Sequence, residues 1–338
     1  MRILIYSPAF APMIGGIERV METLATEFTA AGEDVCVVCQ AADQTQRSFP
    51  FAIVRQPGVI ELIRLFRWAD VVMHANISLR GLLPFLLVRR PWVATHHGWY
   101  WVLGRPMPWQ ARLKLWASRF ATNIACSRAV AEHVGGRCQV IPNPYEETIF
   151  RRWPDVAQDH DIIFVGRLVS DKGVDLLVLA LGLLKQKGVT LSLTITGEGP
   201  EEAPLRLLVE QHGLTRQVTF TGKRSGTDLS RLMGAHRVLV APSRCNEGFG
   251  MVALEGAASG CVVIGSEGGG LVDAIGPCGS VVPKEDVHAL SMAIQKTLAS
   301  PSACADGEAA CVLHLTRHAP RKVSEAYLHT LKIAVRVA

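Results

Sequence analysis

The sequence predicts an α/β protein built from two Rossmann-like, doubly wound parallel-sheet domains. The chain has 338 residues, which is more than one hydrophobic core usually holds, so we expect two domains of roughly 150 residues. Short apolar runs alternate with helical patterns along most of the chain, as in repeated strand–helix–strand units. A proline-rich turn and a polar segment interrupt this alternation near the middle, and it then restarts.

The first domain opens with Arg2–Tyr6. This run lacks the polar alternation of a half-exposed strand, so we expect it in a parallel sheet covered on both faces. A loop rich in proline and glycine follows, and then a helix over residues 17–31 with Val20, Leu24 and Phe28 along one face. Further strands are expected at Val35–Cys39, Val71–His74, Trp92–His96, Asn123–Cys126 and Val140–Ile141.

The boundary between the domains is predicted in the polar segment that follows Pro142-Asn143-Pro144. We place the N-terminal domain at residues 1–153 and the C-terminal domain at residues 154–316. Residues 317–338 are expected to form a C-terminal helix that can pack back on the N-terminal domain. The second domain is expected to have strands at Ile162–Gly166, Leu191–Thr196, Val218–Phe220, Val238–Val240, Val262–Ile264 and Ser280–Val282, with helices at Gly173–Lys187 and Asp228–Ala235.

Composition excludes several classes of protein. With 49% apolar and 19% charged residues, the chain is typical of a well-buried globular protein and not of a disordered one. The longest apolar runs are about half the ~20 residues that a membrane-spanning helix needs. Nine cysteines are scattered without zinc-like spacing, which suits a reducing compartment, and Cys36 and Cys39 share one apolar strand. We therefore expect a cytoplasmic protein without a metal or resident cofactor.

The segment from Glu247 to Glu255 carries the strongest functional signal. Its two carboxylates are eight positions apart, one in a loop and one in a helix expected to begin near Phe249. Gly248 and Gly250 have no Cβ, so a ligand can approach the backbone closely. The amides of Phe249, Gly250, Met251 and Val252 would then face an anion, assisted by the helix dipole. A ligand with hydroxyls at both ends and phosphate between them fits this pattern, and a nucleotide-sugar has that form.

Two other loops between a strand and a helix carry groups that bind phosphate. Gly15 and Gly16 open the first helix, and Gly166–Gly173 contains Arg167 and Lys172. An arginine fork and a lysine point charge could both reach one diphosphate. Taken alone, the glycines also fit an ordinary turn, and the charged residues also fit a solvated loop.

Asp159-His160-Asp161 resembles the D-x-D pair that holds a divalent metal in other sugar transferases. It precedes an expected strand, at the opposite end of the sheet from the ligand-binding loops of α/β proteins. We therefore interpret it as part of the linker. Positive side chains and helix termini must then neutralise a departing diphosphate.

Gly15-Gly16 with Glu18-Arg19, the Gly-Arg…Lys-Gly loop and the two glutamates in E-x7-E together resemble the glycosyltransferase family 4 enzymes of GT-B fold. The resemblance covers nearly the whole chain. It implies two Rossmann-like domains facing across a cleft and a nucleotide diphosphate sugar as co-substrate. Enzymes of this kind retain the anomeric configuration, and the leaving phosphate oxygen helps to deprotonate the acceptor hydroxyl on the same face.

The resemblance also implies roles for individual residues. Gly16 would offer its amide to the donor diphosphate, and Arg167 and Lys172 would clamp that diphosphate. Glu247 would bind the hydroxyls of the transferred sugar, and Glu255 the ribose hydroxyls. The amides from Phe249 to Val252 would cover the sugar and the phosphates, and the backbone of Lys223-Arg224 would meet the base. His96 matches a histidine that contacts the reacting sugar, although its neighbour His97 leaves the choice between the two open.

The acceptor side is signalled by a basic, tryptophan-rich segment. Between Asp70 and Glu132 there is no acidic residue, yet five of the seven tryptophans lie there. This combination suits an anionic membrane surface, a lipid-diphosphate acceptor or sugar rings stacked on indoles, whereas the phosphate-binding loops of the other domain argue against nucleic acid. Ordinary core tryptophans beside a solvated basic face remain the alternative. The residues are Trp92, Trp99, Trp101, Trp109 and Trp116, with Arg89, Arg90, Arg105, Arg112, Lys114 and Arg119.

We therefore predict a retaining, metal-independent glycosyltransferase. It would move a hexose from a nucleotide diphosphate sugar, UDP-glucose or a related UDP-sugar, to a glycan or lipid-linked acceptor in surface or envelope polysaccharide biosynthesis, in the cytoplasm or at the inner face of the cell membrane. Two alternatives stay open: a non-catalytic nucleotide-sugar-binding subunit, and a GT-B nucleotide-sugar epimerase or hydrolase.

Overall fold

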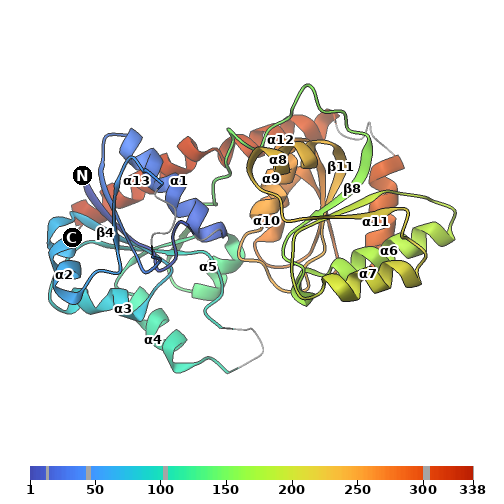
Figure 1. Ribbon diagram of the computed structural model, residues 1–338. Coiled ribbons are helices and arrows are strands. Elements are labelled where there is room, and N and C mark those ends of the chain that lie inside the picture. Colours follow the sequence, from blue (N-terminus) through green and yellow to red (C-terminus); the bar gives the residue numbers. More distant parts are fainter. Residues whose placement is uncertain (13–14, 43–46, 102–105, 300–304, 338) are drawn as a thin grey trace. The chain divides into compact units, whose positions relative to one another are not determined.

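The computed structural model describes residues 1–12, 15–42, 47–101, 106–299 and 305–337 (Figure 1). The chain forms two compact units. Unit 1 comprises Met1–Pro144 with His318–Ala338, and unit 2 comprises Tyr145–Arg317. Each unit has one parallel sheet with helices packed on it, which is the architecture that the sequence predicts.

Unit 1 contains a seven-stranded sheet in the order β3-β2-β1-β4-β5-β6-β7. All its strand pairs are parallel. Strands β2 and β3 are added on one side of β1 and strands β4 to β7 on its other side, so the switch point lies between β1 and β4. The central strands β4 and β5 are buried throughout and β1 is buried except at Arg2, as the unbroken apolar runs indicated. The strands are β1 (Arg2–Tyr6), β2 (Asp34–Cys39), β3 (Ala52–Arg55), β4 (Val71–Ala75), β5 (Trp92–His96), β6 (Thr122–Ala125) and β7 (Cys138–Val140).

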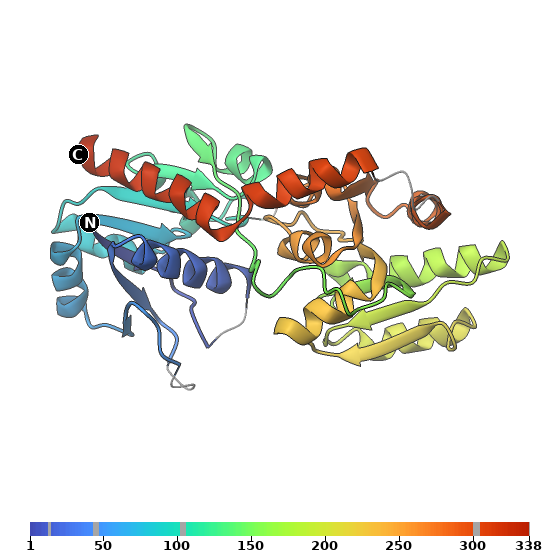
Figure 2. The same ribbon diagram turned by 90° about the horizontal axis from the view of Figure 1, so that it is seen from above.

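The C-terminal helix of the chain groups with unit 1. Helix α13 (Pro320–Val337) lies beside α1 (Gly16–Ala30) and also contacts β4 and β5 (Figures 1 and 2). Its contacts include a hydrogen bond from Thr330 to the Gln139 side chain and an ion pair between Lys332 and Glu33. The other helices of the unit are α2 (Val59–Trp68), α3 (Leu79–Leu82), the 3-10 turn η1 (Leu83–Leu86), α4 (Trp109–Ser118) and α5 (Arg128–Val134).

Unit 2 contains a six-stranded parallel sheet in the order β10-β9-β8-β11-β12-β13. The strands are β8 (His160–Val165), β9 (Leu193–Thr196), β10 (Val218–Gly222), β11 (His236–Ala241), β12 (Val262–Ser266) and β13 (Gly279–Val282). The helices are α6 (Val174–Gln186), α7 (Glu202–Gln211), α8 (Gly226–Gly234), α9 (Met251–Ser259), α10 (Leu271–Ile275), α11 (Val287–Ala299) and α12 (Ala305–Arg317), with 3-10 turns η2 (Ser170–Lys172) and η3 (Gly276–Cys278). The strand order reverses between β8 and β11, so the loops after these two strands flank the position where open α/β sheets bind ligands.

Two details differ from the sequence prediction. Strand β3 was not predicted, because this edge strand is only partly buried and lacks a continuous apolar run. The boundary was predicted after Trp153, but unit 1 ends at Pro144. The intervening residues pack on unit 2, where the Trp153 indole donates a hydrogen bond to Ser230 Oγ at 3.0 Å.

The cysteines also differ from the expectation of scattered thiols. Cys278 in η3 and Cys311 in α12 form a disulfide across 33 residues of chain, a pairing that no spacing rule indicated. Cys36 and Cys39 are buried in β2, as an apolar strand requires. In the part of the chain that the structure describes, every helix is too short or too polar to cross a lipid bilayer.

Candidate functional site

The loops after β8 and β11 are joined to each other in unit 2. Gly173 has a left-handed backbone with φ of +66°, and a Cβ on it would lie 2.1 Å from the Pro242 carbonyl oxygen, so only glycine permits this approach. The Arg244 amide donates a hydrogen bond to the Asp171 carbonyl at 2.8 Å, and its guanidinium donates to the Ser170 carbonyl at 2.8 Å. Two segments that are distant in sequence therefore form one surface at the carboxyl edge of the sheet.

This junction brings Lys172 to Glu247. The lysine Nζ donates to Glu247 Oε1 at 2.5 Å, and Ser243 Oγ donates to the same oxygen at 2.7 Å. Among the described residues, nothing is hydrogen-bonded to the other carboxylate oxygen, Oε2. The side chains of Lys172 and Glu247 are 23% and 19% exposed, so a ligand can reach both. The carboxylate is thus fixed through one oxygen and offers the second to a hydroxyl donor.

Arg244 also fixes the loop that carries Lys172. Its guanidinium donates to Asp175 Oδ1 at 2.7 Å and to Oδ2 at 2.5 Å, in a two-pronged ion pair. Burial opposes ionisation of Asp175, but the hydrogen bonds and the charge of Arg244 outweigh it and lower the pKa of this carboxyl. The sequence reasoning missed Arg244 because it weighed each loop alone. The signal available was an arginine four residues after a strand at the same sheet edge.

The second glutamate of E-x7-E lies inside helix α9. Glu255 is 7% exposed, and most of the helix around it is buried. The helix begins at Met251, two residues after the predicted start at Phe249, whose side chain is buried in the core. Gly250 precedes the helix with a left-handed φ of +95° and provides no side-chain cap. The first-turn amides of Met251 and Val252 have no acceptor within the helix, so they are available to an anion.

The remaining predicted basic residues of unit 2 are on its surface. Arg167 is exposed in the loop after β8, and Lys223 and Arg224 are exposed after β10. None of the three has a carboxylate partner in the described ranges. The structure therefore joins Lys172 to Glu247, while it leaves Arg167 beside the site without a contact to either residue.

Another pair at this sheet edge escaped the sequence reasoning. Lys284, in the loop after β13, donates a hydrogen bond to Asn246 Oδ1, next to Glu247 in the chain. The Gly269 backbone forms a bridge with Glu247, and the Gly270 amide donates to the Glu247 carbonyl at 2.8 Å. The loops after β12 and β13 thus support the Glu247 segment. A lysine two residues after the end of β13 was the signal that could have identified this pair.

The site residues predicted in unit 1 are, as a group, less accessible to a ligand than those in unit 2. Gly15 caps α1 in an extended conformation, and the Glu18 carboxylate fills the space beside it, 2.3 Å from where a Cβ of Gly15 would stand. Gly16 is exposed as the first residue of the helix. Residues 13–14, immediately before them, and Arg105 lie outside the described ranges.

His96 is fully buried at the end of β5. Its Nε2 lies 3.0 Å from Asn123 Oδ1, and its Nδ1 lies 2.8 Å from Tyr100 Oη. The Asn123 amide nitrogen donates to two backbone carbonyls, which leaves Oδ1 as the acceptor, so His96 carries its proton on Nε2. Burial lowers the pKa of His96 to about 4, and the ring is therefore neutral at pH 7.

His97 is 8% exposed and is held in the same way. Its Nδ1 lies 3.0 Å from Asn143 Oδ1 and its Nε2 lies 2.9 Å from Thr95 Oγ1, while burial lowers its pKa to about 4. Both rings use both nitrogens for contacts within unit 1. The structure therefore does not choose between them as a ligand to the sugar, and the contact expected of His96 stays a prediction.

No described residues form a group of three or more His, Cys, Asp or Glu side chains placed to hold a metal ion. The D-x-D motif lies at the start of β8, where the Asp161 carboxylate accepts hydrogen bonds from Ser192 N at 2.9 Å and Ser192 Oγ at 3.0 Å. This is the end of the sheet opposite to the Lys172–Glu247 pair, but His160 and Asp161 belong to β8 itself and not to the linker that the sequence predicted.

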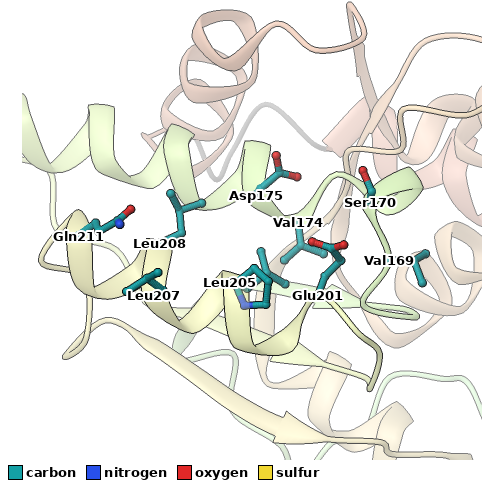
Figure 3. A pocket seen from close by; sticks show the side chains of 10 residues that line it. Val169, Ser170, Val174, Asp175, Glu201, Leu205, Leu207, Leu208 and Gln211 are labelled. Carbon is teal, nitrogen blue, oxygen red and sulfur yellow. The ribbon is translucent and has the colours of Figure 1, made fainter.

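A cavity of about 280 Å³ lies between α6 and α7 (Figure 3). Figure 3 shows Asp175 and Glu201 on its rim and the apolar side chains of Leu205 and Leu208 on its wall. Its lining includes two carboxylates and neither lysine nor arginine, so it does not suit a diphosphate. The anion-binding groups lie instead on the Lys172 side of the β8 loop.

The fold and the site define a two-unit Rossmann-like α/β protein whose functional loops meet at the switch point of the second sheet. Comparison with known protein families gives two matches. The family described as "Glycosyl transferases group 1" matches residues 146–309, and the family described as "Glycosyltransferase Family 4" matches residues 14–147. The chain belongs to the family 4 glycosyltransferases of GT-B fold.

Curated relatives span most of the chain. Glycogen synthase of Mycobacterium tuberculosis is 28% identical, over 90% of this chain and 87% of the relative. A GDP-mannose-dependent alpha-(1-6)-phosphatidylinositol monomannoside mannosyltransferase of Mycolicibacterium smegmatis is 29% identical, over 54% of this chain and 51% of the relative. Both relatives are named as enzymes that act on sugars.

Solved structures share the fold. HepE of Anabaena, crystallised with UDP, superposes with a TM-score of 0.83 at 20% identity, over 98% of this chain and all of the other. WaaG, a glycosyltransferase involved in lipopolysaccharide biosynthesis, gives a TM-score of 0.68 at 18% identity, over 96% of this chain and 99% of the other.

Proposed function

We propose that this glycosyltransferase is a retaining, metal-independent enzyme that moves a hexose from UDP-glucose or a related UDP-sugar. The acceptor is a glycan or a lipid-linked saccharide in surface or envelope polysaccharide biosynthesis. One observation carries the proposal: the Lys172–Glu247 pair stands beside the open N-terminus of α9, at the switch point of unit 2. A cation, a carboxylate with a free oxygen and helix amides together suit a sugar diphosphate.

The diphosphate is bound by groups of three kinds. Lys172 supplies a charge already oriented by Glu247, and the amides of Met251 and Val252 supply the positive end of a helix. Arg167 is exposed beside them, so its guanidinium can turn to the phosphates when the donor arrives. These groups neutralise the diphosphate as it leaves, which is why the proposed reaction uses no metal ion.

The sugar and the nucleoside occupy the two sides of this phosphate site. Glu247 Oε2 accepts a hydrogen bond from a hydroxyl of the transferred hexose. Glu255 accepts hydrogen bonds from the ribose, and the backbone of Lys223 and Arg224 contacts the base. The family resemblance further implies a contact from Gly16 to the diphosphate and one from His96 or His97 to the sugar.

The chemistry proceeds on one face of the sugar. The bond between the anomeric carbon and the phosphate oxygen breaks, and the acceptor oxygen bonds to that carbon from the same side. The acceptor proton passes to the leaving phosphate oxygen, so the anomeric configuration is retained. Glu247 supports this scheme as an anchor, because Lys172 and Ser243 both hold one of its oxygens and restrict its approach as a nucleophile.

The choice of UDP over GDP is supported by a solved structure of similar fold. HepE has been crystallised with UDP-glucose, whereas the mannosyltransferase relative is named for GDP-mannose. Thermal stabilisation by a panel of UDP- and GDP-sugars tests the choice directly, because a bound ligand raises the stability of the folded state. A shift given by GDP-mannose and not by UDP-glucose would overturn the UDP assignment.

A coupled assay separates transfer from the two alternatives. A transferase releases nucleotide diphosphate in proportion to added acceptor and forms a glycosylated product. A hydrolase releases it without acceptor, an epimerase converts the donor without releasing it, and a silent binding subunit does neither. Product formation should also persist in EDTA, and a complete loss in EDTA restored by Mg²⁺ would reject the metal-independent mechanism.

A further inference from the structure

Unit 1 exposes a group of large apolar side chains on two neighbouring segments. Trp109, Leu113 and Trp116 belong to α4 and Phe120 lies in the turn just after it, and their exposed fractions are 65%, 40%, 56% and 70%. Leu83, Leu86 and Leu87 belong to η1 and the residue after it, and they are 55%, 81% and 70% exposed. We refer to these seven residues as the α4 surface.

The α4 residues form one stripe. Their spacing of four, three and four places them on a single face of the helix, and the rings of Trp116 and Phe120 meet edge to face at 5.2 Å. Ala111, Ala117 and Ser118, on the opposite side of the helix, are buried against the unit. The stripe is therefore directed to solvent and not to the core of unit 1.

The two segments share one foundation. Leu82 and Phe85 of α3–η1 and Ala121, just after α4, pack against a cluster built from Ile77, Trp92 and other buried residues. Since both segments rest on the same cluster, their exposed side chains lie on adjoining parts of the unit. The apolar area is thus a patch and not a scatter of single residues.

The chain segment that carries the α4 surface has charged residues of one sign. Arg112 and Arg119 are exposed along one edge of the α4 stripe, and Arg89 is exposed shortly after η1. The sequence has no aspartate or glutamate between Asp70 and Glu132. A protein partner presents charges of both signs, whereas an anionic bilayer presents a plane of negative charge. The arginines along this edge complement such a plane, and no carboxylate of the same segment would be repelled by it.

We propose that the α4 surface docks unit 1 on a membrane that contains anionic lipid. The indole and phenyl rings and the leucines enter the headgroup boundary, while the arginines remain at the phosphates. Docking would favour a lipid-linked acceptor over a free glycan, and in this it rests on the proposed function. Membrane binding itself depends on no residue of the donor site, so the two proposals can fail separately.

The structure narrows the tryptophans that the sequence placed in this region. Trp92 is 9% exposed, and Trp99 and Trp101 pack on His133 with ring centroids 4.8 and 3.7 Å away. Only Trp109 and Trp116 of the five therefore belong to the docking surface. The expectation that some of these tryptophans serve the core was correct for Trp92.

Vesicle flotation with the full-length protein tests the proposal. The vesicles contain either phosphatidylcholine alone or phosphatidylcholine with phosphatidylglycerol, at low and at high salt. The wild-type protein should float with the anionic vesicles, and the bound fraction should fall in high salt. Trp109→Ser with Trp116→Ser, and separately Arg112→Glu with Arg119→Glu, should each lower the partition coefficient by about tenfold or more.

Matched controls come from unit 2, which exposes comparable residues. Leu207 is 55% and Met292 is 61% exposed, so Leu207→Ser with Met292→Ser should leave flotation unchanged. Arg216→Glu with Lys296→Glu controls for net charge. UDP-glucose stabilisation is measured for each variant as a test of folding and of the donor site.

Three outcomes would overturn the docking proposal. These are equal recovery with neutral and anionic vesicles, equal loss in the unit 2 controls, and a wild-type dimer that becomes monomeric in the α4 variants without binding vesicles. Loss of flotation with donor stabilisation intact would confirm docking. Absence of donor stabilisation in the wild type would instead count against the proposed function alone.

Discussion

At the scale of single residues, the site depends on how Glu247 is held. Lys172 and Ser243 both bond to Oε1, so the carboxylate is oriented and still able to accept a hydrogen bond from a hydroxyl through Oε2. In the proposed function, this division of the two oxygens separates phosphate binding by Lys172 from sugar binding by Glu247. Substitutions of the two charged partners should therefore have different effects on UDP and on UDP-sugar.

Lys172→Ala should weaken binding of both UDP and UDP-glucose by about 2–5 kcal/mol, because a desolvated diphosphate loses its cation. Glu247→Gln should leave the affinity for UDP close to wild type and weaken UDP-glucose by about 1.5–3 kcal/mol, the scale of a charged hydrogen bond. Isothermal titration calorimetry measures both. Lys296→Ala, an exposed lysine of α11, is the control, and equal losses of UDP affinity in both site variants would refute the division of roles.

A second residue-scale feature is His74 in β4. It is fully buried among aromatic rings, neither ring nitrogen has a hydrogen-bond partner among the described residues, and burial lowers its pKa to about 3. The unfolded chain binds a proton at His74 below about pH 6.5, and the folded chain does not. The stability of unit 1 is therefore lost progressively as the pH falls from 6.5 towards 3.

His74→Leu should remove this dependence. The variant should be as stable as wild type at pH 7.5 or more stable by about 1 kcal/mol, because an unpaired buried polar group is removed. Below pH 6.5 its advantage should grow by up to about 1.4 kcal/mol per pH unit. Urea unfolding between pH 7.5 and 5 measures this, with His329→Gln in α13 as the exposed control. Parallel pH profiles for wild type and His74→Leu would contradict the assignment.

At the scale of elements, the site is a junction between the loops after β8 and β11. Arg244 spans it with its backbone and its guanidinium, and Asp175 at the start of α6 holds the guanidinium in place. Lys172 therefore reaches Glu247 because the loop that carries it is fastened at Ser170 and Asp171. This makes Arg244 a positioning residue that acts through Lys172.

Arg244→Gln should lower UDP affinity by about 1 kcal/mol, the scale of one hydrogen bond, without removing a group that touches the donor. Arg206→Gln, which breaks a surface pair with Glu202 on α7, is the matched control and should bind UDP as wild type does. If Arg244→Gln binds UDP normally, the lysine loop is held without this contact.

Asp175→Asn tests the ion pair with Arg244 through the pH dependence of the protein's stability. The pKa of Asp175 is lowered in the folded state, so its pairing stabilises the protein above the ordinary value of 3.8 and is lost as the pH falls below it. Wild type should therefore unfold at a higher temperature than Asp175→Asn at pH 7, and the difference should shrink below pH 4. Calorimetric scans measure it, and a difference independent of pH would mean that the ion pair is not its source.

At the scale of the whole molecule, the two units divide the work. Unit 2 contains the loops proposed to bind the donor, and unit 1 contains the α4 surface and the buried histidines His74, His96 and His97. UDP should therefore slow hydrogen exchange in residues 166–173 and 242–251 of unit 2, because a bound ligand stabilises the segments that it contacts. Mass spectrometry of the exchanging amides measures this. Protection confined to Leu205 and Leu208 would move the nucleotide to the cavity between α6 and α7.

The sequence by itself determined the two parallel sheets and indicated the loops on which the proposed function rests. Buried parallel strands require unbroken apolar runs and ligand loops require glycine, so both can be recognised in the sequence. The edge strand β3 could not be recognised in this way, since it is only partly buried. The disulfide between Cys278 and Cys311 could not be predicted either, because the spacing of cysteines along the chain does not say which of them meet in space.

Only the tertiary structure decided which side chains meet. Lys172 and Glu247 are 75 residues apart, and their contact exists because two loops pack edge to edge at the switch point. The burial of His96 and the exposure of Trp109 and Trp116 follow likewise from the packing of β5 and α4, which the pattern of residue types leaves open. Periodicity specifies the buried face of an element, whereas a site depends on where separate elements come together.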